Sequence, residues 1–282
     1  MPELPEVQTV VNDLIHAGLI GQKIAGIRVR WPRSIAGFSA DALKAKLIGD
    51  EIKDIRRRGK YIIWELKSTT YMLIHLRMTG RIHLYRTGDP CEKHEHVIIT
   101  LRNGQDIRLH DTRKFARIYM TDDLDSVTGD LGLEPLSAEC TLRRFAKEIR
   151  KYSRQLKPLL LDQRCIAGLG NIYVDETLWH ARLHPLRDSA TLSDYEIRSL
   201  HASIKKVLRT GLRNMGTTLG SGKGNFYSVA RRRGKNRYAL NVFRRTGMPC
   251  PRCGEKIERL IVGQRGTHVC GTCQGRGERG GG

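Results

Sequence analysis

The sequence has few acidic residues, no long hydrophobic run and no secretory signal. Its 282 residues include 29 Asp and Glu against 50 Lys and Arg. No apolar stretch approaches the roughly 20 residues that a transmembrane helix needs. Glu3 and Glu6 interrupt the N-terminus before the apolar core of a signal peptide could begin. We therefore expect a cytoplasmic protein without membrane contact, in a chain long enough for two domains with a core each.

The excess positive charge is concentrated near the C-terminus. From Lys205 onward the chain has 18 Lys and Arg against 3 Glu, so 15 of its 21 net positive charges lie in the last 78 residues. Such an excess indicates a polyanionic partner, and its uneven distribution indicates a binding face. Nucleic acid is the expected partner. An anionic membrane surface is a distant second, because no basic amphipathic helix with an aromatic face stands out.

Seven cysteines are present, and their odd number, without a secretory signal, favours reduced thiols over a disulfide framework. Cys91, Cys140 and Cys165 are scattered along the chain, and we expect them to be small buried hydrophobic residues. Catalytic use of these three is not expected.

The other four cysteines form two Cys-x-x-Cys pairs near the C-terminus. Cys250 and Cys253 precede Cys270 and Cys273, with 16 residues between the pairs. This spacing is typical of a zinc ribbon, in which each Cys-x-x-Cys pair supplies two of the four ligands of one metal ion. Four thiolates leave no open coordination position, so the sequence predicts one structural Zn²⁺ rather than a catalytic metal.

The first six residues suggest a catalytic amine. Removal of Met1 is expected because a small residue follows, and it would leave Pro2 as the N-terminus. An α-amine titrates at about 7.7–8.0 and can attack an electrophilic carbon when unprotonated. Glu3 and Glu6 could move protons beside it. The structural alternative is that Pro5 begins a helix and the two carboxylates merely suit its positive end.

Hydrophobic periodicity predicts a helix over residues 7–15 that Gly18 and Gly21 end. Short β-branched runs then occupy residues 24–120, and turn signals such as Asn103-Gly104 separate them, which predicts hairpins in an antiparallel sandwich or barrel. A short helix is expected at 39–47. The clearest predicted strands are 60–66, 71–76, 96–101 and 106–109.

Helical periodicity takes over after a Gly-, Ser- and Pro-containing linker. Helices are predicted at 142–150, 156–162, 172–182 and 193–215. The turn at 165–171 contains two glycines and opens onto a helix. Its free backbone N–H groups could hold a phosphate, although a plain helix corner that needs glycine for space is equally compatible. The composition of residues 215–238 predicts a flexible basic loop, and a disordered connector is the alternative.

Three polar segments lie among the predicted strands: residues 56–60, 75–80 and 110–115. By default Met78 and Phe115 are core or hairpin residues, and the basic residues are solvated. The run His94-Glu95-His96 could bind a metal, but further ligands are missing nearby, so we expect it at the surface.

Together these motifs resemble the bacterial formamidopyrimidine-DNA glycosylases over essentially the whole chain. The resemblance implies an α+β fold with an N-terminal β-sandwich, a helix–two-turn–helix domain and a four-cysteine zinc ribbon, with DNA across the cleft between the domains. It would be a monomer on double-stranded DNA that contains oxidised bases or abasic sites. The motifs that carry the resemblance are Pro2-Glu3-Leu4-Pro5-Glu6, Gly168-Leu169-Gly170-Asn171-Ile172-Tyr173, Gln264-Arg265 and Cys273-Gln274.

The same resemblance divides the chain into segments. Residues 1–125 would be the catalytic sandwich, 126–138 a linker, 139–240 the helical DNA-binding domain with a lesion-capping loop, and 241–275 the zinc finger. The Gly- and Arg-rich tail, residues 276–282, is predicted to be disordered. The protein would lie with the nucleoid in the cytoplasm.

For catalysis the resemblance assigns four residues. Pro2 would attack the sugar C1′ of an oxidised purine nucleotide, and Glu3 would be the acid and base for base loss and ring opening. Glu6 would support the terminus. Lys60, placed beside the phosphate of the lesion, belongs to the same group. The activity implied is that of a glycosylase and abasic-site lyase which excises 8-oxoguanine and formamidopyrimidines and then performs β,δ-elimination.

For DNA binding the resemblance assigns seven further residues. His75, Asn171 and Arg265 would contact phosphates, and Lys157 would lie near the active site. The other three would fill the void left by the extruded nucleotide, with Arg113 facing the orphaned cytosine: Met78, Arg113 and Phe115. Extrusion costs a few kcal/mol, which an apolar wedge and a bidentate donor would offset in part.

Two other functions remain open from the sequence. An endonuclease VIII-type enzyme shares the terminal proline and glutamate but prefers oxidised pyrimidines, whereas Leu4 and the complete void-filling set favour the purine enzyme. A non-catalytic DNA-binding protein would explain the charge and the zinc ribbon but would give Pro2 no role. The segment Gly-Ser-Gly-Lys-Gly at 220–224 and the run Arg231-Arg232-Arg233 depart from the pattern expected of the capping loop, which leaves the preferred lesion open.

Overall fold

The computed structural model describes residues 1–220 and 225–275. The predicted tail and most of the Gly-Ser-Gly-Lys-Gly segment therefore lie outside the described residues. These residues form two compact units: 1–130 with 211–220 and 225–237, and 131–210 with 238–275. The described residues of 211–237, which the sequence places in the helical domain, pack with the N-terminal unit.

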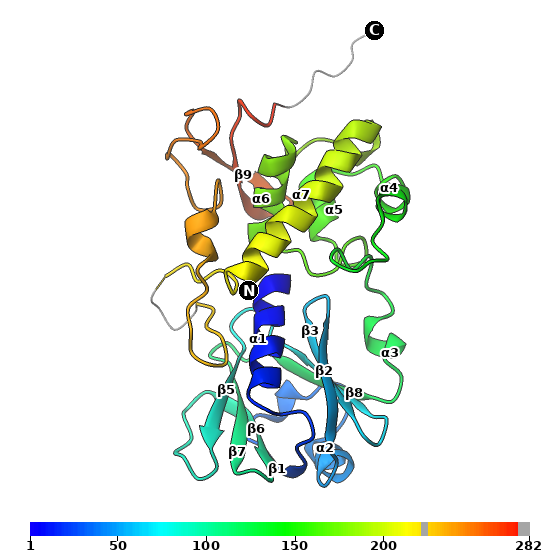
Figure 1. The fold of residues 1–282 in the computed structure, drawn as a ribbon, viewed down its shortest axis with the longest axis vertical. Helices are drawn as coiled ribbons and strands as arrows, with labels where there is room; N and C mark the ends of the chain where they lie inside the picture. The colour runs from blue at the N-terminus through cyan, green and yellow to red at the C-terminus, as the bar shows by residue number, and fades with distance from the viewer. Residues whose placement is uncertain (221–224, 276–282) are drawn as a thin grey trace. The chain divides into compact units, whose positions relative to one another are not determined.

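The N-terminal unit is an antiparallel β-sandwich with helices at its edges (Figure 1). Within the described residues, one four-stranded sheet has the order β1-β6-β7-β5 and the other β2-β3-β4-β8. The first sheet contains β1 (Ile24–Val29), β5 (Arg81–Arg86), β6 (Glu95–Leu101) and β7 (Gln105–His110). The second contains β2 (Ile52–Arg58), β3 (Tyr61–Leu66), β4 (Tyr71–His75) and β8 (Arg117–Thr121).

The helix α1 (Leu4–His16) packs against the sandwich and contributes to its hydrophobic core. Its apolar side chains recur at helical spacing, so Val7, Val10, Val11 and Leu14 face the sandwich and are buried. Inward-facing residues of both sheets, such as Trp64 of β3, complete the same core. Shorter helices at the periphery are α2 (Ala40–Leu47) and α3 (Asp125–Thr128).

The second unit is helical and ends in a β-hairpin. Its helices are α4 (Leu142–Ile149), α5 (Leu156–Leu161), α6 (Asn171–Ala181) and α7 (Asp194–Arg213), and its strands are β9 (Glu258–Val262) and β10 (Arg265–Val269). Almost every residue of α6 is buried, including Asp175 and Glu176. Glu176 accepts hydrogen bonds from the backbone N–H groups of Asn241, Val242 and Phe243 at 2.9–3.0 Å. This carboxylate therefore ties the central helix to the segment that leads into the hairpin.

The α+β class, the N-terminal sandwich and the predicted helices are confirmed. None of the helices in the described part of the chain has the length and apolar character required to cross a bilayer.

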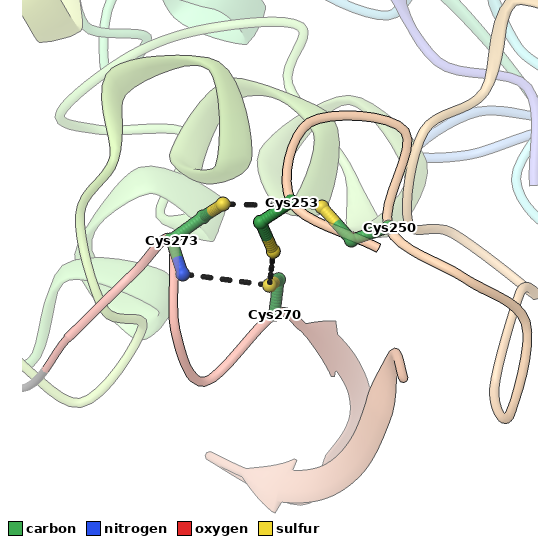
Figure 2. A group of neighbouring side chains, drawn as sticks. All are labelled: Cys250, Cys253, Cys270 and Cys273. Atoms are coloured by element: carbon green, nitrogen blue, oxygen red, sulfur yellow. Dashed lines mark hydrogen bonds between the residues drawn. The ribbon is translucent and has the colours of Figure 1, made fainter. Parts of the chain in front are cut away.

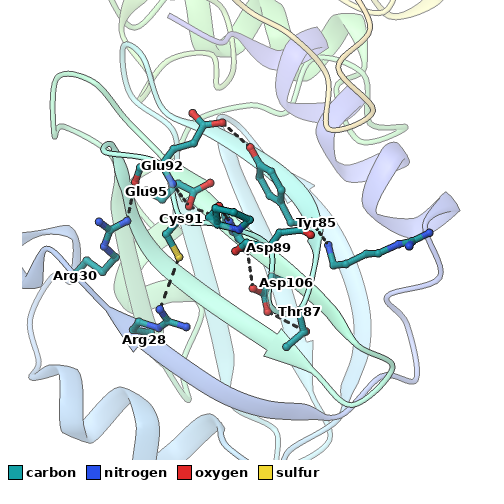
Figure 3. A network of polar contacts seen from close by, with 12 residues as sticks. Arg28, Arg30, Tyr85, Thr87, Asp89, Cys91, Glu92, Glu95 and Asp106 are labelled. Carbon is teal, nitrogen blue, oxygen red and sulfur yellow. Dashed lines mark hydrogen bonds and ion pairs between the residues drawn. The ribbon is translucent and has the colours of Figure 1, made fainter.

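Two expectations about single segments were wrong. Glu95 and His96 are buried rather than at the surface, because Glu95 pairs with the buried Arg108 at 3.2 Å and His96 hydrogen-bonds to the Asp111 carbonyl at 2.7 Å. Cys140 and Cys165 are buried as expected, but Cys91 is exposed. The guanidinium of Arg28 donates to the Cys91 sulfur at 3.7 Å (Figure 3).

Candidate active site and nucleic-acid interface

The N-terminal carboxylates are fixed by backbone hydrogen bonds. Glu3 precedes the first turn of α1, and its N–H donates to Oε2 of Glu6 at 2.9 Å. The other oxygen of Glu6 accepts a hydrogen bond from the N–H of Thr217 at 2.7 Å. Both carboxylates are buried, with exposed fractions of 2% and 1%, and Pro2 is buried beside them. The predicted nucleophile and two candidate proton carriers thus lie together at the buried start of α1.

Gly216 allows the loop to approach Glu6. Its φ of +78° lies in the left-handed region, and a Cβ at this position would come within 2.9 Å of the Glu6 side chain. Any other residue would therefore be strained and would displace the carboxylate. A glycine in the predicted loop is thus part of the geometry around Glu6 at the predicted catalytic terminus.

Lys60 and His75 lie at the ends of strands in the second sheet and are buried, with exposed fractions of 6% and 8%. The N–H of Arg77 donates to Nδ1 of His75 at 3.0 Å, which places the ring hydrogen on Nε2. Burial, together with the positive charges of Arg77 and Lys60, lowers the pKa of His75 to about 3. His75 is therefore a neutral hydrogen-bond donor at physiological pH, which suits contact with a phosphate oxygen.

The predicted void-filling residues lie on two neighbouring turns. Met78 follows β4, and Arg113 and Phe115 follow β7. Met78 and Phe115 are among the few exposed large hydrophobic residues in the described chain, at 37% and 44%. The Arg113 guanidinium lies over the Phe115 ring at 4.8 Å from its centroid. Exposed apolar side chains beside an arginine are what insertion into a base stack requires.

The buried carboxylate of Asp111 holds these two turns together. It accepts hydrogen bonds from the backbone N–H groups of Arg113, Phe115 and Ala116 at 2.7–3.0 Å. The Thr79 hydroxyl, on the turn of Met78, donates to the same carboxylate. Burial alone would raise the pKa of Asp111, but these hydrogen bonds outweigh it and hold the pKa below its ordinary value.

We expect Asp111→Asn to destabilise the N-terminal unit by about 2–3 kcal/mol at neutral pH, because charge-assisted hydrogen bonds are lost. A carboxyl group with a depressed pKa stabilises the fold above its unfolded pKa, here 3.8, and loses that effect as the pH falls through the folded value. Urea denaturation of both proteins should therefore show a large difference at neutral pH that shrinks as the pH is lowered below 3.8. A difference that keeps its size as the pH falls would contradict this role.

In the second unit, the predicted phosphate ligands surround the start of β10. Arg265 is exposed at the β9–β10 turn, and the Asn171 side chain donates to the carbonyl of Gly266 at 3.0 Å. Lys157 is completely buried; its ammonium pairs with Asp175 at 2.6 Å and donates to the same Gly266 carbonyl at 3.1 Å. Lys157 is therefore placed to hold the hairpin turn of Arg265, not to present its charge to a ligand at the surface.

The four C-terminal cysteines converge at the base of this hairpin (Figure 2). Their sulfur atoms all lie within 4.8 Å of one another, and the Cys250–Cys273 distance is 3.9 Å. A tetrahedral zinc–thiolate centre has sulfur–sulfur edges of about 3.8 Å, so the four residues fit a zinc ion. The indole N–H of Trp179, on α6, donates to the Cys250 sulfur at 3.4 Å. The same helix thus supports both the metal site and the turn of Arg265.

Three residues that support the site were missed by sequence reasoning: Asp13, Asp111 and Thr217. Asp111 follows a strand directly and precedes a turn, a position at which Asp commonly caps backbone N–H groups. That signal was available in the sequence. Asp13 and Thr217 carried no local signal, because their partners lie more than 200 residues away in the chain.

Comparison with known protein families covers most of the chain. Residues 1–118 match the formamidopyrimidine-DNA glycosylase N-terminal domain, and residues 131–223 match the formamidopyrimidine-DNA glycosylase H2TH domain. Residues 247–275 match the zinc finger found in FPG and IleRS. The three matches occur in the order predicted from the motifs.

Curated relatives and solved structures agree with these matches. The formamidopyrimidine-DNA glycosylases of Protochlamydia amoebophila and Herpetosiphon aurantiacus are 44% and 40% identical to the chain, each over 97% of it, and the matches cover 99% and 100% of their own lengths. A Lactococcus lactis FPG mutant in complex with DNA containing Fapy-dG superposes with a TM-score of 0.88 at 36% identity, over 97% of this chain and 100% of that one. A Lactococcus lactis Fpg complex with abasic-site DNA superposes with a TM-score of 0.87 at the same identity, over 97% of this chain and 99% of that one.

Proposed function

Because the chain belongs to the formamidopyrimidine-DNA glycosylase family, we propose that it excises oxidised purines from double-stranded DNA and then cleaves the abasic strand. The observation that carries the proposal is the N-terminal geometry. Glu3 and Glu6 are buried beside Pro2, and the second carboxylate is fixed by two backbone N–H groups. A capping box at the start of α1 accounts for the hydrogen bond between the Glu3 N–H and Glu6, but not for the one that Thr217 donates to the same carboxylate.

The chemistry begins when removal of Met1 frees the nitrogen of Pro2. This nitrogen attacks C1′ of the damaged nucleotide, the bond from C1′ to the base breaks, and the sugar ring opens to an iminium. Glu3 supplies the proton that the leaving base or the ring oxygen needs. Loss of a C2′ proton then expels the 3′ phosphate, and loss of a C4′ proton expels the 5′ phosphate, which leaves a gap flanked by phosphates. Water hydrolyses the remaining iminium, which releases the sugar fragment and restores the free nitrogen of Pro2.

DNA contacts residues of both units in this proposal. His75 and Lys60 in the first unit, and Asn171 and Arg265 in the second, hold phosphates of the damaged strand. Met78, Arg113 and Phe115 enter the duplex where the nucleotide has left the stack. The segment from 216 to 238, here called the capping loop, closes over the extruded base.

A zinc ion held by Cys250, Cys253, Cys270 and Cys273 would be structural, because four thiolates leave no open coordination position. These cysteines would then fix the base of the hairpin that carries Arg265, while Lys157 fixes the turn itself through the carbonyl of Gly266. Lys157 acts on DNA only through that turn, because its charge is satisfied by Asp175. The protein acts as a monomer.

A comparison of base excision from two duplexes that differ only in the lesion tests the substrate class. We expect faster base release from an 8-oxoguanine:C duplex than from a thymine-glycol duplex of the same sequence, measured in single turnover. The reverse preference would favour the endonuclease VIII-type alternative. Release from neither duplex, combined with DNA binding, would favour the non-catalytic alternative.

A further inference from the structure

The capping loop is built on a polar framework in the part of the chain that the structure describes. Its two ends pair with each other: Gly234 donates to the Thr218 hydroxyl at 2.8 Å, and the Asn236 side chain donates to the Thr217 hydroxyl at 3.0 Å. The Thr218 hydroxyl in turn donates to the carbonyl of Phe226 at 2.6 Å. These buried contacts fix the base of the loop and leave the position of the turn at 228–232 to be set by other groups.

A carboxylate of α1 sets that position. Asp13 lies on the same helix as Glu6 but two turns further along. One of its oxygens accepts a hydrogen bond from the N–H of Ala230 at 3.2 Å, and the other pairs with the Arg232 guanidinium at 2.6 Å. Only 5% of the Asp13 side chain is exposed, so its charge requires these partners. Val229, directly before Ala230, is buried in the sandwich core.

The two neighbours of Arg232 also make contacts within the protein. Arg231 lies over the ring of Tyr85, on β5, at 5.0 Å. Arg233 lies over Tyr227 at 5.8 Å and donates to the carbonyl of Gly220 at 3.4 Å. The arginine run that had no explanation in the sequence therefore anchors the loop to a helix, to a sheet and to itself.

We propose that Asp13 and Arg232 form a latch that positions the capping loop for recognition of the extruded base. The inference rests on the proposed function, because it assigns the latch to the base-excision step. The helix that carries the nucleophile contacts both sides of the loop, through Glu6 at Thr217 and through Asp13 at Ala230 and Arg232. The described part of the loop is therefore held at two points by the helix that directly follows Pro2 and Glu3. The Asp13 carboxylate is buried against Ala230 and Arg232, so the role proposed for it is that of a positioning residue.

The latch predicts a difference between two substrates. A preformed abasic site has no base to cap, whereas an oxidised purine must be held by the loop before it is released. Asp13→Ala and Arg232→Gln should therefore slow base excision from an 8-oxoguanine:C duplex by about tenfold or more, the effect of losing a charge-assisted hydrogen bond. Cleavage of a preformed abasic duplex should stay within about twofold of wild type under the same single-turnover conditions.

Matched variants separate the latch from changes in charge or fold. Asp41→Ala and Arg102→Gln make the same charge changes at exposed positions of the same unit and should leave both reactions unchanged. Arg232→Lys keeps the positive charge and should recover most of the excision rate. The double variant Asp13→Ala with Arg232→Gln should be no slower than Asp13→Ala alone, because that single variant already removes the pair between Asp13 and Arg232.

Amide hydrogen exchange of the DNA-free protein measures how firmly the capping loop is held at Ala230. Asp13→Ala should accelerate exchange of the Ala230 N–H without accelerating exchange in the sandwich core. Equal losses on both substrates, additive losses in the double variant, or unchanged excision would each overturn the latch. If the wild type released no oxidised base, the proposed function would fail, which is a distinct result from any of these.

Discussion

A protein that keeps residues ahead of Pro2 is expected to lose all cleavage of lesion-containing DNA. The nitrogen of Pro2 is then part of a peptide bond, and its electron pair is delocalised into the carbonyl, so it cannot attack C1′. The chain can be produced with a removable N-terminal tag and tested before and after the tag is cut to leave Pro2 first. Strand cleavage of an 8-oxoguanine:C duplex should be absent before cutting and present afterwards.

DNA affinity provides the control for that comparison. Both forms should bind a duplex that carries an uncleavable abasic analogue, and a similar affinity would show that the tag blocks the chemistry rather than access. Cleavage by the tagged form at the rate of the cut form would contradict a role for the terminal nitrogen.

Replacement of Cys270 with serine is expected to abolish tight DNA binding. A structural zinc site contributes about 10–16 kcal/mol to the folding of a small ribbon, so loss of one thiolate should unfold the hairpin that carries Arg265. The effect is measured as zinc content, by metal analysis, and as affinity for an 8-oxoguanine:C duplex. Treatment of the wild-type protein with a strong chelator should give the same loss of binding.

Cys91→Ser is the matched control, because Cys91 is exposed and lies outside the four-cysteine cluster. This variant should retain one zinc and wild-type affinity. Full DNA binding by Cys270→Ser after loss of its zinc would contradict this prediction, because the hairpin would then either fold without the metal or contribute nothing to binding.

Much of the fold follows from local patterns in the sequence. The helical spacing of Val7, Val10, Val11 and Leu14 predicts α1, and the turn signal at Asn103-Gly104 falls between β6 and β7. The four cysteines were found by spacing alone, because the geometry of a zinc ribbon is local to each pair. These features depend on residues close together in the chain.

The polar supports of the site could not be predicted in the same way. The latch joins residues 219 positions apart, and the hydrogen bond from Thr217 to Glu6 spans 211 positions. Periodicity carries no information about such pairs. For the same reason the buried Glu95 looked like a surface residue, since its pairing with Arg108 appears only when β6 and β7 are placed in register.

For Lys157 the resemblance predicts a place near the active site, and that role stays a prediction. The structure adds what the sequence could not give: the ammonium is buried within the second unit, against Asp175 and the Gly266 carbonyl. Burial of an ammonium requires such partners. Both contacts depend on residues far from Lys157 in the chain, so no local pattern predicts them.

Reductive trapping tests the central proposal most directly. Borohydride converts an iminium between the protein and the sugar into a stable amine, and mass spectrometry of the digested complex identifies the linked residue. With an 8-oxoguanine:C duplex and the mature protein, we predict a single adduct on the peptide that begins with Pro2. An adduct on a lysine such as Lys60, or strand cleavage without any adduct, would contradict it.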